Sequence, residues 1–215
     1  MELNPMDKIE SLTEKGRSFR NFASFDVKAV EDGAEKTAEG IACVFNRSTV
    51  IFRADGIDYN EIIDSRAFDS CDMTDVIFNY NHSGKVIART RNSTLQLSVE
   101  PSGLHISAKL DGTEEGRKIY EEIKGGYIDR MSFAFVVAAE GEDYDQATHT
   151  RTIRSIKKLY DVSAVDIPAY NTTSINARSL ISLDREVKEK LDSLNEQKRR
   201  KLLLLLKIEG GPTYE

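Results

Sequence analysis

The sequence predicts an α+β protein that is mostly β-sheet and ends in one long helix. Short stretches in which apolar and polar residues alternate recur up to Val165, and this period of two is typical of strands with one buried face. After Leu183 the apolar residues are spaced by three and four positions, which is the spacing of one helix face. With 215 residues, of which 40% are hydrophobic, the chain can bury a core of its own.

Strands are expected along most of this body. Residues 95–99 and 104–108 each alternate, and Pro101-Ser-Gly103 supplies a turn between them, so the pattern predicts a meander across residues 86–110. Further strands are expected at residues 41–45, 50–52, 76–80, 131–139 and 150–165.

Two short helices and one loop are expected between these strands. Residues 59–68 are predicted to form a helix that buries its two isoleucines and Phe68. Thr113 is expected to cap a helix that runs to Lys124, where two glycines follow and end it. Residues 140–146 are polar and are expected to form a loop.

Composition divides the chain into three parts: a flexible arm at residues 1–15, a globular domain at 16–180, and a charged helix and tail at 181–215. The net charge is -6, although residues 183–207 carry eight basic and five acidic residues, so the body is acidic. An acidic body argues against a nucleic-acid-binding protein, which needs a basic face. The terminal helix could serve assembly or tethering, or it could pack on its own domain.

Several classes of protein and site have no support in the sequence. The longest apolar run has seven residues, so neither a membrane span nor a secretory signal is expected. Cys43 and Cys71 are too few for a disulfide framework or a four-cysteine zinc site, and we expect free thiols in a reducing compartment. The H-E-x-x-H, G-x-S-x-G and P-loop motifs are absent, and no metal or cofactor is expected.

The three histidines are the first candidates for a catalytic base. His82 stands where a predicted strand meets a Gly-containing turn, and functional groups are often presented at such strand ends. Taken alone, however, it is more often an ordinary turn histidine. His105 is out of phase with Leu104 and Ile106, so it is expected to face solvent. His149 follows the polar loop and is also expected on the surface, although a place in a triad stays open.

A serine nucleophile needs a base, and the base needs a group that orients it. Ser132 lies between Met131 and Phe133 at the start of the most strand-like segment, where a serine on the open face of a sheet is the ordinary interpretation. Asp161 and Asp166 stand in an apolar stretch, where a carboxylate costs free energy unless it is paired or exposed. Five positions apart in a strand, they point to opposite faces, so at most one is expected to serve the site.

Several short motifs also follow one another in a recognisable order. They are Glu61-Ile-Ile-Asp-Ser-Arg-Ala-Phe68, Asn81-His82, Val86-Ile-Ala-Arg89, Leu97 to Leu110, Lys124-Gly-Gly126 with Met131-Ser-Phe-Ala-Phe135, Asp161-Val-Ser163 and Pro168-Ala-Tyr170. This set resembles the prohead, or capsid maturation, serine proteases of tailed phages, a family related in fold to the herpesvirus assemblins. The chain departs from the family pattern at Arg66 and Ala134, where glycine is usual, and at Asp161, where glutamate is common.

The resemblance implies a serine endopeptidase with Ser132 as nucleophile, His82 as general base and Asp161 as the orienting carboxylate. His149 and Asp166 remain further candidates for the third place, and Arg89 is a candidate for the oxyanion region. The implied fold is a small antiparallel β-barrel flanked by helices, like that of the herpesvirus proteases.

The implied substrates are scaffolding protein, the delta segment of the major capsid protein, and the protease itself, within the immature prohead in the host cytoplasm. A homo-oligomer, with a dimer favoured, and self-cleavage beyond residue 180 would fit the same interpretation. One alternative is a non-catalytic scaffold or shell-assembly protein on the same fold, supported by the terminal helix. Another is a β-rich binding domain with no phage role, against which the ordered motifs argue.

Overall fold

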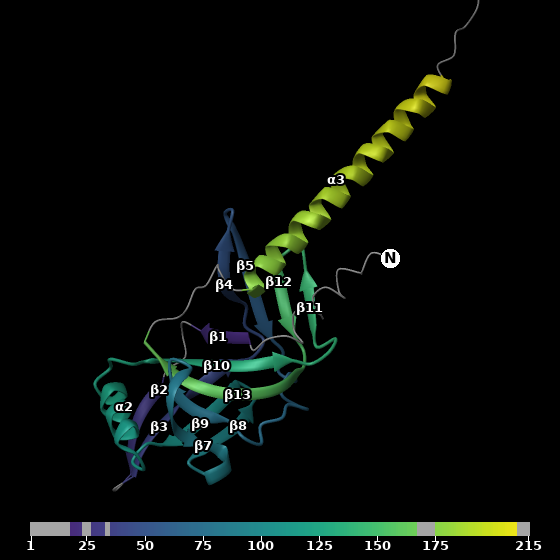
Figure 1. The fold of residues 1–215 in the computed structure, drawn as a ribbon. Coiled ribbons are helices and arrows are strands. Elements are labelled where there is room, and N and C mark those ends of the chain that lie inside the picture. The colour runs from purple at the N-terminus through teal and green to yellow at the C-terminus, as the bar shows by residue number, and fades with distance from the viewer. Residues whose placement is uncertain (1–17, 23–26, 33–34, 167–174, 210–215) are drawn as a thin grey trace, which may run out of the picture. The chain divides into compact units, whose positions relative to one another are not determined.

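The computed structural model describes residues 18–22, 27–32, 35–166 and 175–209. The chain divides into two units, Met1–Thr172 and Thr173–Glu215. The described part of the first unit is mostly strand, and that of the second is one long helix (Figure 1). The predicted α+β class with a dominant β content is therefore confirmed, whereas the predicted arm at residues 1–15 lies outside the described residues.

The strands of the first unit form three sheets. The first contains, in spatial order, β1 (Ser18–Phe22), β10 (Arg130–Val137), β13 (Ile156–Val165), β6 (Ile77–Tyr80) and β7 (Ser83–Arg89). The second contains β11 (Glu142–Asp145), β12 (Thr150–Ile153), β5 (Ile57–Ile63) and β4 (Thr49–Ala54). The third contains β2 (Val27–Asp32), β3 (Glu35–Val44), β9 (Gly103–Lys109) and β8 (Leu95–Glu100), and the short helix η1 (Thr90–Asn92) connects β7 to β8.

The closed antiparallel barrel implied by the family resemblance is not found among the described strands. A barrel closes only when its first and last strands pair with each other, but β1 and β7 are the two open edges of the first sheet. The first and second sheets are also mixed, because β13 pairs in parallel with β6 and β12 pairs in parallel with β5. Long crossover connections therefore bring strands from distant parts of the chain side by side.

The hydrophobic core draws buried residues from β3, β6, β9, β10, β13 and the helix α2 (Glu114–Lys124). The hydroxyl of Thr113 accepts a hydrogen bond from the backbone N–H of Gly116 at 2.9 Å, so the predicted N-cap is confirmed. Helix α2 buries Ile119, Tyr120 and Ile123 and packs against β2 and β3. The strands predicted at 76–80, across 86–110 and at 131–139 are likewise confirmed by β6 to β10.

The predicted helix at residues 59–68 is wrong, because the first half of this segment belongs to strand β5. Tyr59, Glu61 and Ile63 are buried and the residues between them are half-buried, which is the alternation of a strand. A hairpin turn at Asp55-Gly56, with φ values of 51° and 79°, joins β4 to β5. Asp-Gly suits a turn that needs two left-handed residues, and this signal outweighs the helical spacing of the isoleucines.

The predicted loop at residues 140–146 is wrong in part, because β11 occupies its centre and pairs with β12. The polar character of this segment does not keep it exposed, since Glu142 is buried. Arg151 compensates the burial by donating to Glu142 Oε2 through Nε at 2.6 Å and to Glu61 Oε2 through Nη1 at 3.1 Å. Buried charges are tolerated when they are paired in this way.

In the second unit, helix α3 (Ile175–Glu209) is 35 residues long. The predicted C-terminal helix is thus confirmed, although it begins before Leu183. Two leucines on its predicted apolar stripe, Leu191 and Leu194, expose 56% and 53% of their surface. Among the described helices, none combines the length and apolar character that crossing a membrane requires.

Candidate active site

Strand pairing aligns a row of polar residues across the first sheet. Ser132 on β10 lies opposite Ser163 on β13, and Ser163 in turn lies opposite Asn79 on β6. Residues that are directly opposite in a sheet project to the same face. Asp161 is two positions before Ser163 on β13, so it projects to that face as well. The register therefore gathers a hydroxyl and a carboxylate in one place.

His82 reaches this face from the tight turn between β6 and β7. Tyr80 pairs with Ser83, which leaves Asn81 and His82 as a two-residue loop with φ values of 50° and 54°. Two left-handed residues define the turn type that matches strand twist in hairpins, and asparagine favours its first position. The backbone N–H of Asn81 donates to Ala164 O at 3.0 Å, which fixes the turn against β13.

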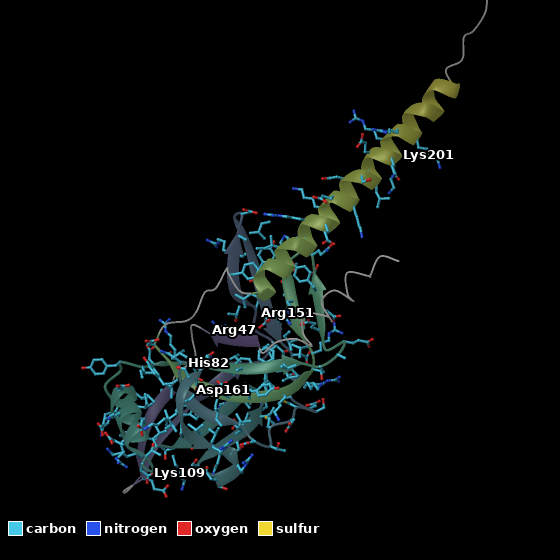
Figure 2. The ribbon with its side chains drawn as sticks, in the orientation of Figure 1. Arg47, His82, Lys109, Arg151, Asp161 and Lys201 are labelled. Carbon is cyan, nitrogen blue, oxygen red and sulfur yellow. The ribbon has the colours of Figure 1, made fainter. Side chains whose placement is uncertain are left out.

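The side chains of Ser132, His82 and Asp161 form one hydrogen-bonded series. His82 Nε2 lies 2.5 Å from Ser132 Oγ, and His82 Nδ1 lies 2.5 Å from Asp161 Oδ1. A carboxylate can only accept at neutral pH, so Nδ1 carries the proton and Nε2 is left to accept the hydroxyl proton of Ser132. Figure 2 labels His82 and Asp161, which lie next to each other in the β-rich unit.

This series is enclosed. Ser132 has no exposed surface, and the side chains of His82 and Asp161 expose only 13% and 6% of theirs. In a water-poor environment the interaction between an imidazolium and a carboxylate is stronger than in bulk water. The arrangement can therefore withdraw a proton from a hydroxyl and stabilise the positive charge that this creates.

The two other candidates for the third position are located elsewhere. The carboxylate of Asp166 is exposed and accepts a hydrogen bond from the Tyr80 hydroxyl at 2.9 Å, which raises the pKa of Tyr80. His149 follows β11 in the turn before β12, where its Nδ1 lies 3.4 Å from the hydroxyl of Tyr144. Of the three predicted partners, Asp161 is the one that this structure brings to His82.

Arg89 closes β7 and forms a two-point ion pair with Asp75. Its Nε donates to Asp75 Oδ1 at 2.7 Å and its Nη2 donates to Asp75 Oδ2 at 3.0 Å. The guanidinium is thus held by a carboxylate, and its part in an oxyanion region stays a prediction. Within the described ranges, no group of three or more metal-ligating side chains comes together.

Sequence analysis missed two residues of this site, Ser163 and Asn79. Both are buried, and the Ser163 hydroxyl contacts Asn79, Asp161 and His82. The one available signal was the spacing of Asp161 and Ser163, because residues two apart in a strand share a face. Asn79 could not be found in this way, since its place depends on the pairing of β6 with β13.

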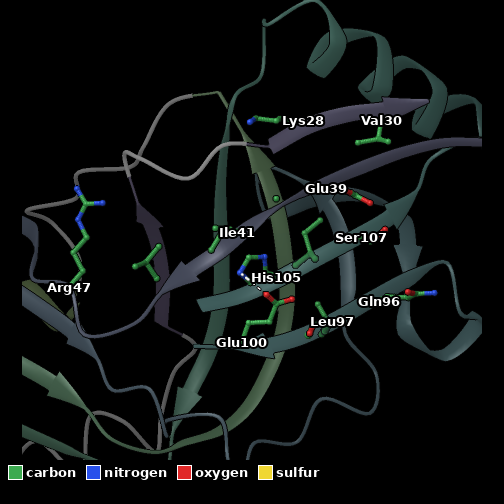
Figure 3. A pocket seen from close by; sticks show the side chains of 14 residues that line it. Lys28, Val30, Glu39, Ile41, Arg47, Gln96, Leu97, Glu100, His105 and Ser107 are labelled. Atoms are coloured by element: carbon green, nitrogen blue, oxygen red, sulfur yellow. Dashed lines mark ion pairs between the residues drawn. The ribbon is translucent and has the colours of Figure 1, made fainter. Parts of the chain in front are cut away.

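A surface pocket of about 610 Å³ lies on the third sheet, and the residues of the hydrogen-bonded series do not line it (Figure 3). His105 lines this pocket. Its Nε2 atom lies 2.7 Å from Ser102 Oγ and 3.6 Å from Glu100 Oε2. Leu104 and Ile106 are buried while the His105 side chain is 30% exposed, so the predicted alternation is confirmed.

A hydroxyl, an imidazole and a carboxylate in this order form the arrangement that serine hydrolases use. In a comparison with protein-family models, residues 23–186 match the caudovirus prohead serine protease family. Because the match covers most of the chain, the protein belongs to this family.

Comparison with curated proteins finds no match. Among solved structures, the chain is similar to the capsid assembly protease gp21 of bacteriophage T4, with 13% sequence identity and a TM-score of 0.44. The similarity covers 71% of this chain and 98% of that protein. The herpesvirus-protease-like fold stays a prediction.

Proposed function

We propose that this protein is a serine endopeptidase of phage capsid maturation, with Ser132 as nucleophile, His82 as general base and Asp161 as the orienting carboxylate. Family membership supports protease activity. The observation that carries the residue assignment is the continuous series from Ser132 Oγ through the His82 ring to Asp161 Oδ1, with 2.5 Å at each step.

In the proposed mechanism, Ser132 Oγ attacks the carbonyl carbon of the scissile peptide bond while its proton moves to His82 Nε2. Asp161 stabilises the imidazolium and keeps its Nδ1 proton in place. When the tetrahedral intermediate collapses, the C–N bond breaks and Nε2 gives the proton to the leaving amine. Water then attacks the acyl-enzyme with His82 again as base, which releases the acid product and restores Ser132.

We further propose that the substrates are scaffolding protein and the major capsid protein inside the immature prohead, in the host cytoplasm, and that the protease also cleaves itself. Membership of the caudovirus prohead serine protease family supports a role in the prohead. Arg89 is a candidate oxyanion donor for this chemistry.

Intact-mass measurement of the purified protein tests this function. The parent and the Ser132→Ala variant are incubated alone and with scaffolding and capsid proteins, and a fluorophosphonate probe is added to separate samples. We expect time-dependent fragments, and a phosphonyl group on the Ser132 peptide, in the parent only. Ser107→Ala, which changes a serine of β9 outside the series, should behave like the parent. Cleavage that persists in Ser132→Ala would overturn the residue assignment.

The C-terminal unit supports a second role, in assembly. Helix α3 exposes Leu191 and Leu194 among charged residues, and such a surface can pair with other helices, either of scaffold or of a second copy. We propose that residues 181–215 recruit the protease into proheads and are then removed. Deletion of residues 183–215 should abolish packaging but leave the labelling of Ser132 intact. Normal packaging of the shortened chain would argue against this role.

A further inference from the structure

The hydroxyl of Ser163 touches both partners of the Asp161–His82 contact. We propose that Ser163 is a positioning residue, whose hydroxyl holds the Asp161 carboxylate against His82 Nδ1, and that Asn79 orients this hydroxyl. The inference rests on the proposed function and adds two residues to it. Neither residue touches the reacting atoms of a substrate, so both act through Asp161.

The place of Ser163 is fixed by pairing on both sides. Strand β13 lies between β10 and β6, and Ser163 is directly opposite Ser132 on the one and Asn79 on the other. Ser163 has no exposed surface and Asn79 exposes 4%. A polar group buried this deeply requires hydrogen bonds within the protein.

The contacts of Ser163 Oγ form a small network. The oxygen lies 2.9 Å from Asp161 Oδ1, 3.1 Å from His82 Nδ1 and 2.5 Å from Asn79 Oδ1. A hydroxyl has a single proton, so it cannot donate to Asn79 and to Asp161 at the same time. A half-turn of the Asn79 amide places its NH2 group on Ser163, so that Asn79 donates to Ser163 Oγ and the Ser163 hydroxyl donates to Asp161 Oδ1.

In this arrangement Asp161 Oδ1 receives two hydrogen bonds, one from His82 Nδ1–H and one from Ser163 Oγ–H. The second donor limits rotation of the carboxylate, so Oδ1 stays in line with the imidazole. Alignment matters more as His82 becomes positively charged, because only interactions that strengthen toward the transition state accelerate the reaction. Removing the Ser163 hydroxyl should therefore slow the attack by Ser132 by about 10- to 100-fold.

A purely structural role for Ser163 predicts a different outcome. In that case the hydroxyl serves only to satisfy the buried amide of Asn79, with which it has its shortest contact. The variant Ser163→Ala would then lower the thermal unfolding midpoint, while folded molecules would keep the parent's reactivity at Ser132. Reactivity of the folded protein and its stability must therefore be measured separately.

The test compares Ser163→Ala, Ser163→Thr and Asn79→Ala with the parent, and uses Ser107→Ala as a matched serine deletion outside the network. Two quantities are measured on the full-length protein at a temperature at which each variant is folded. The first is the rate of fluorophosphonate labelling at Ser132, followed by intact mass. The second is the far-downfield proton NMR resonance of His82 Nδ1–H, which reports its hydrogen bond to Asp161.

We expect Ser163→Ala to lose about 10- to 100-fold in labelling rate and to shift or broaden the Nδ1–H resonance. Ser163→Thr keeps a hydroxyl and should recover most of the rate. In Asn79→Ala the Ser163 hydroxyl can still donate its hydrogen bond to Asp161, so the labelling rate should fall less than in Ser163→Ala. The proposal would be overturned if Ser163→Ala kept the parent's labelling rate and Nδ1–H resonance. It would also be overturned if Asn79→Ala lost more labelling rate than Ser163→Ala.

Two further outcomes are covered by the same design. If Ser163→Ala does not fold, Ser163→Cys replaces it, because a thiol keeps most of the volume but is a weak donor. If the parent is not labelled at all, the proposed function fails. The NMR resonance then decides the positioning role by itself, because it reports the contact between Asp161 and His82 without any substrate. An unchanged resonance in Ser163→Ala, or in the Ser163→Cys variant that replaces it, would overturn the positioning role.

Discussion

The substitution Asp161→Asn removes the charge of the proposed orienting residue and leaves its shape almost unchanged. Asp161 Oδ1 lies 2.5 Å from His82 Nδ1, which places the centres of the carboxylate and the imidazole ring about 4 Å apart. At that separation and an effective dielectric of about 20, an imidazolium and a carboxylate attract by about 4 kcal/mol. Loss of this attraction in the transition state corresponds to a rate about 10³-fold lower.

The tautomer of His82 adds to this effect. An asparagine amide can donate to Nδ1, and His82 would then carry its proton on Nε2, where it cannot accept the proton of Ser132. The assay is fluorophosphonate labelling of Ser132 at neutral pH, with thermal unfolding as the folding control. Asp161→Glu keeps the charge and should lose much less activity than Asp161→Asn. A folded Asp161→Asn protein that is labelled at nearly the parent's rate would refute the reasoning.

Three further predictions concern other parts of the first unit. Ser132 is buried, and Asn21 of β1 lies directly opposite it. The variant Arg20→Pro should loosen β1 and raise the rate at which Ser132 is labelled. An unchanged labelling rate would show that β1 does not limit access to Ser132. Burial raises the pKa of the Cys71 thiol to about 11, so iodoacetamide should modify it at least about a hundredfold more slowly at pH 8 than an unfolded cysteine, and the rate should rise about tenfold per pH unit. Thr113→Ala removes the hydrogen bond to Gly116 N and should lower the free energy of unfolding by about 1 kcal/mol in urea titrations, with recovery in Thr113→Ser.

Local patterns in the sequence predicted those elements whose signals do not depend on distant parts of the chain. Helix α2 is an example, because the cap at Thr113 and the stop at Gly125 lie within a few residues of the helix they bound. The segment at 59–68 failed for the opposite reason. Its isoleucines suit a helix or a strand, and the hairpin at Asp55-Gly56 with the pairing of β5 to β12 decides for the strand.

The candidate site shows the same division. Taken one at a time, Ser132, His82 and Asp161 each fit a structural role with no catalysis. The order of the family motifs along the chain is what predicts that they form one site. The contacts themselves depend on strand register, which a sequence does not reveal for strands so far apart. Ser163 and Asn79 were missed because their part in the network follows from β13 lying between β10 and β6.

The alignment of the candidate site depends on the inner strands of the first sheet. Pairing of β13 with β10 and β6 sets the row that holds Ser132, Ser163 and Asn79, whereas β1 pairs with β10 alone among the described strands. Detachment of β1 would break its pairing with β10 and leave the other strand pairings of the first sheet in place. Because the hydrogen bonds among Ser132, His82 and Asp161 do not involve β1, loss of the pairing between β1 and β10 would leave the geometry on which the proposed chemistry depends in place.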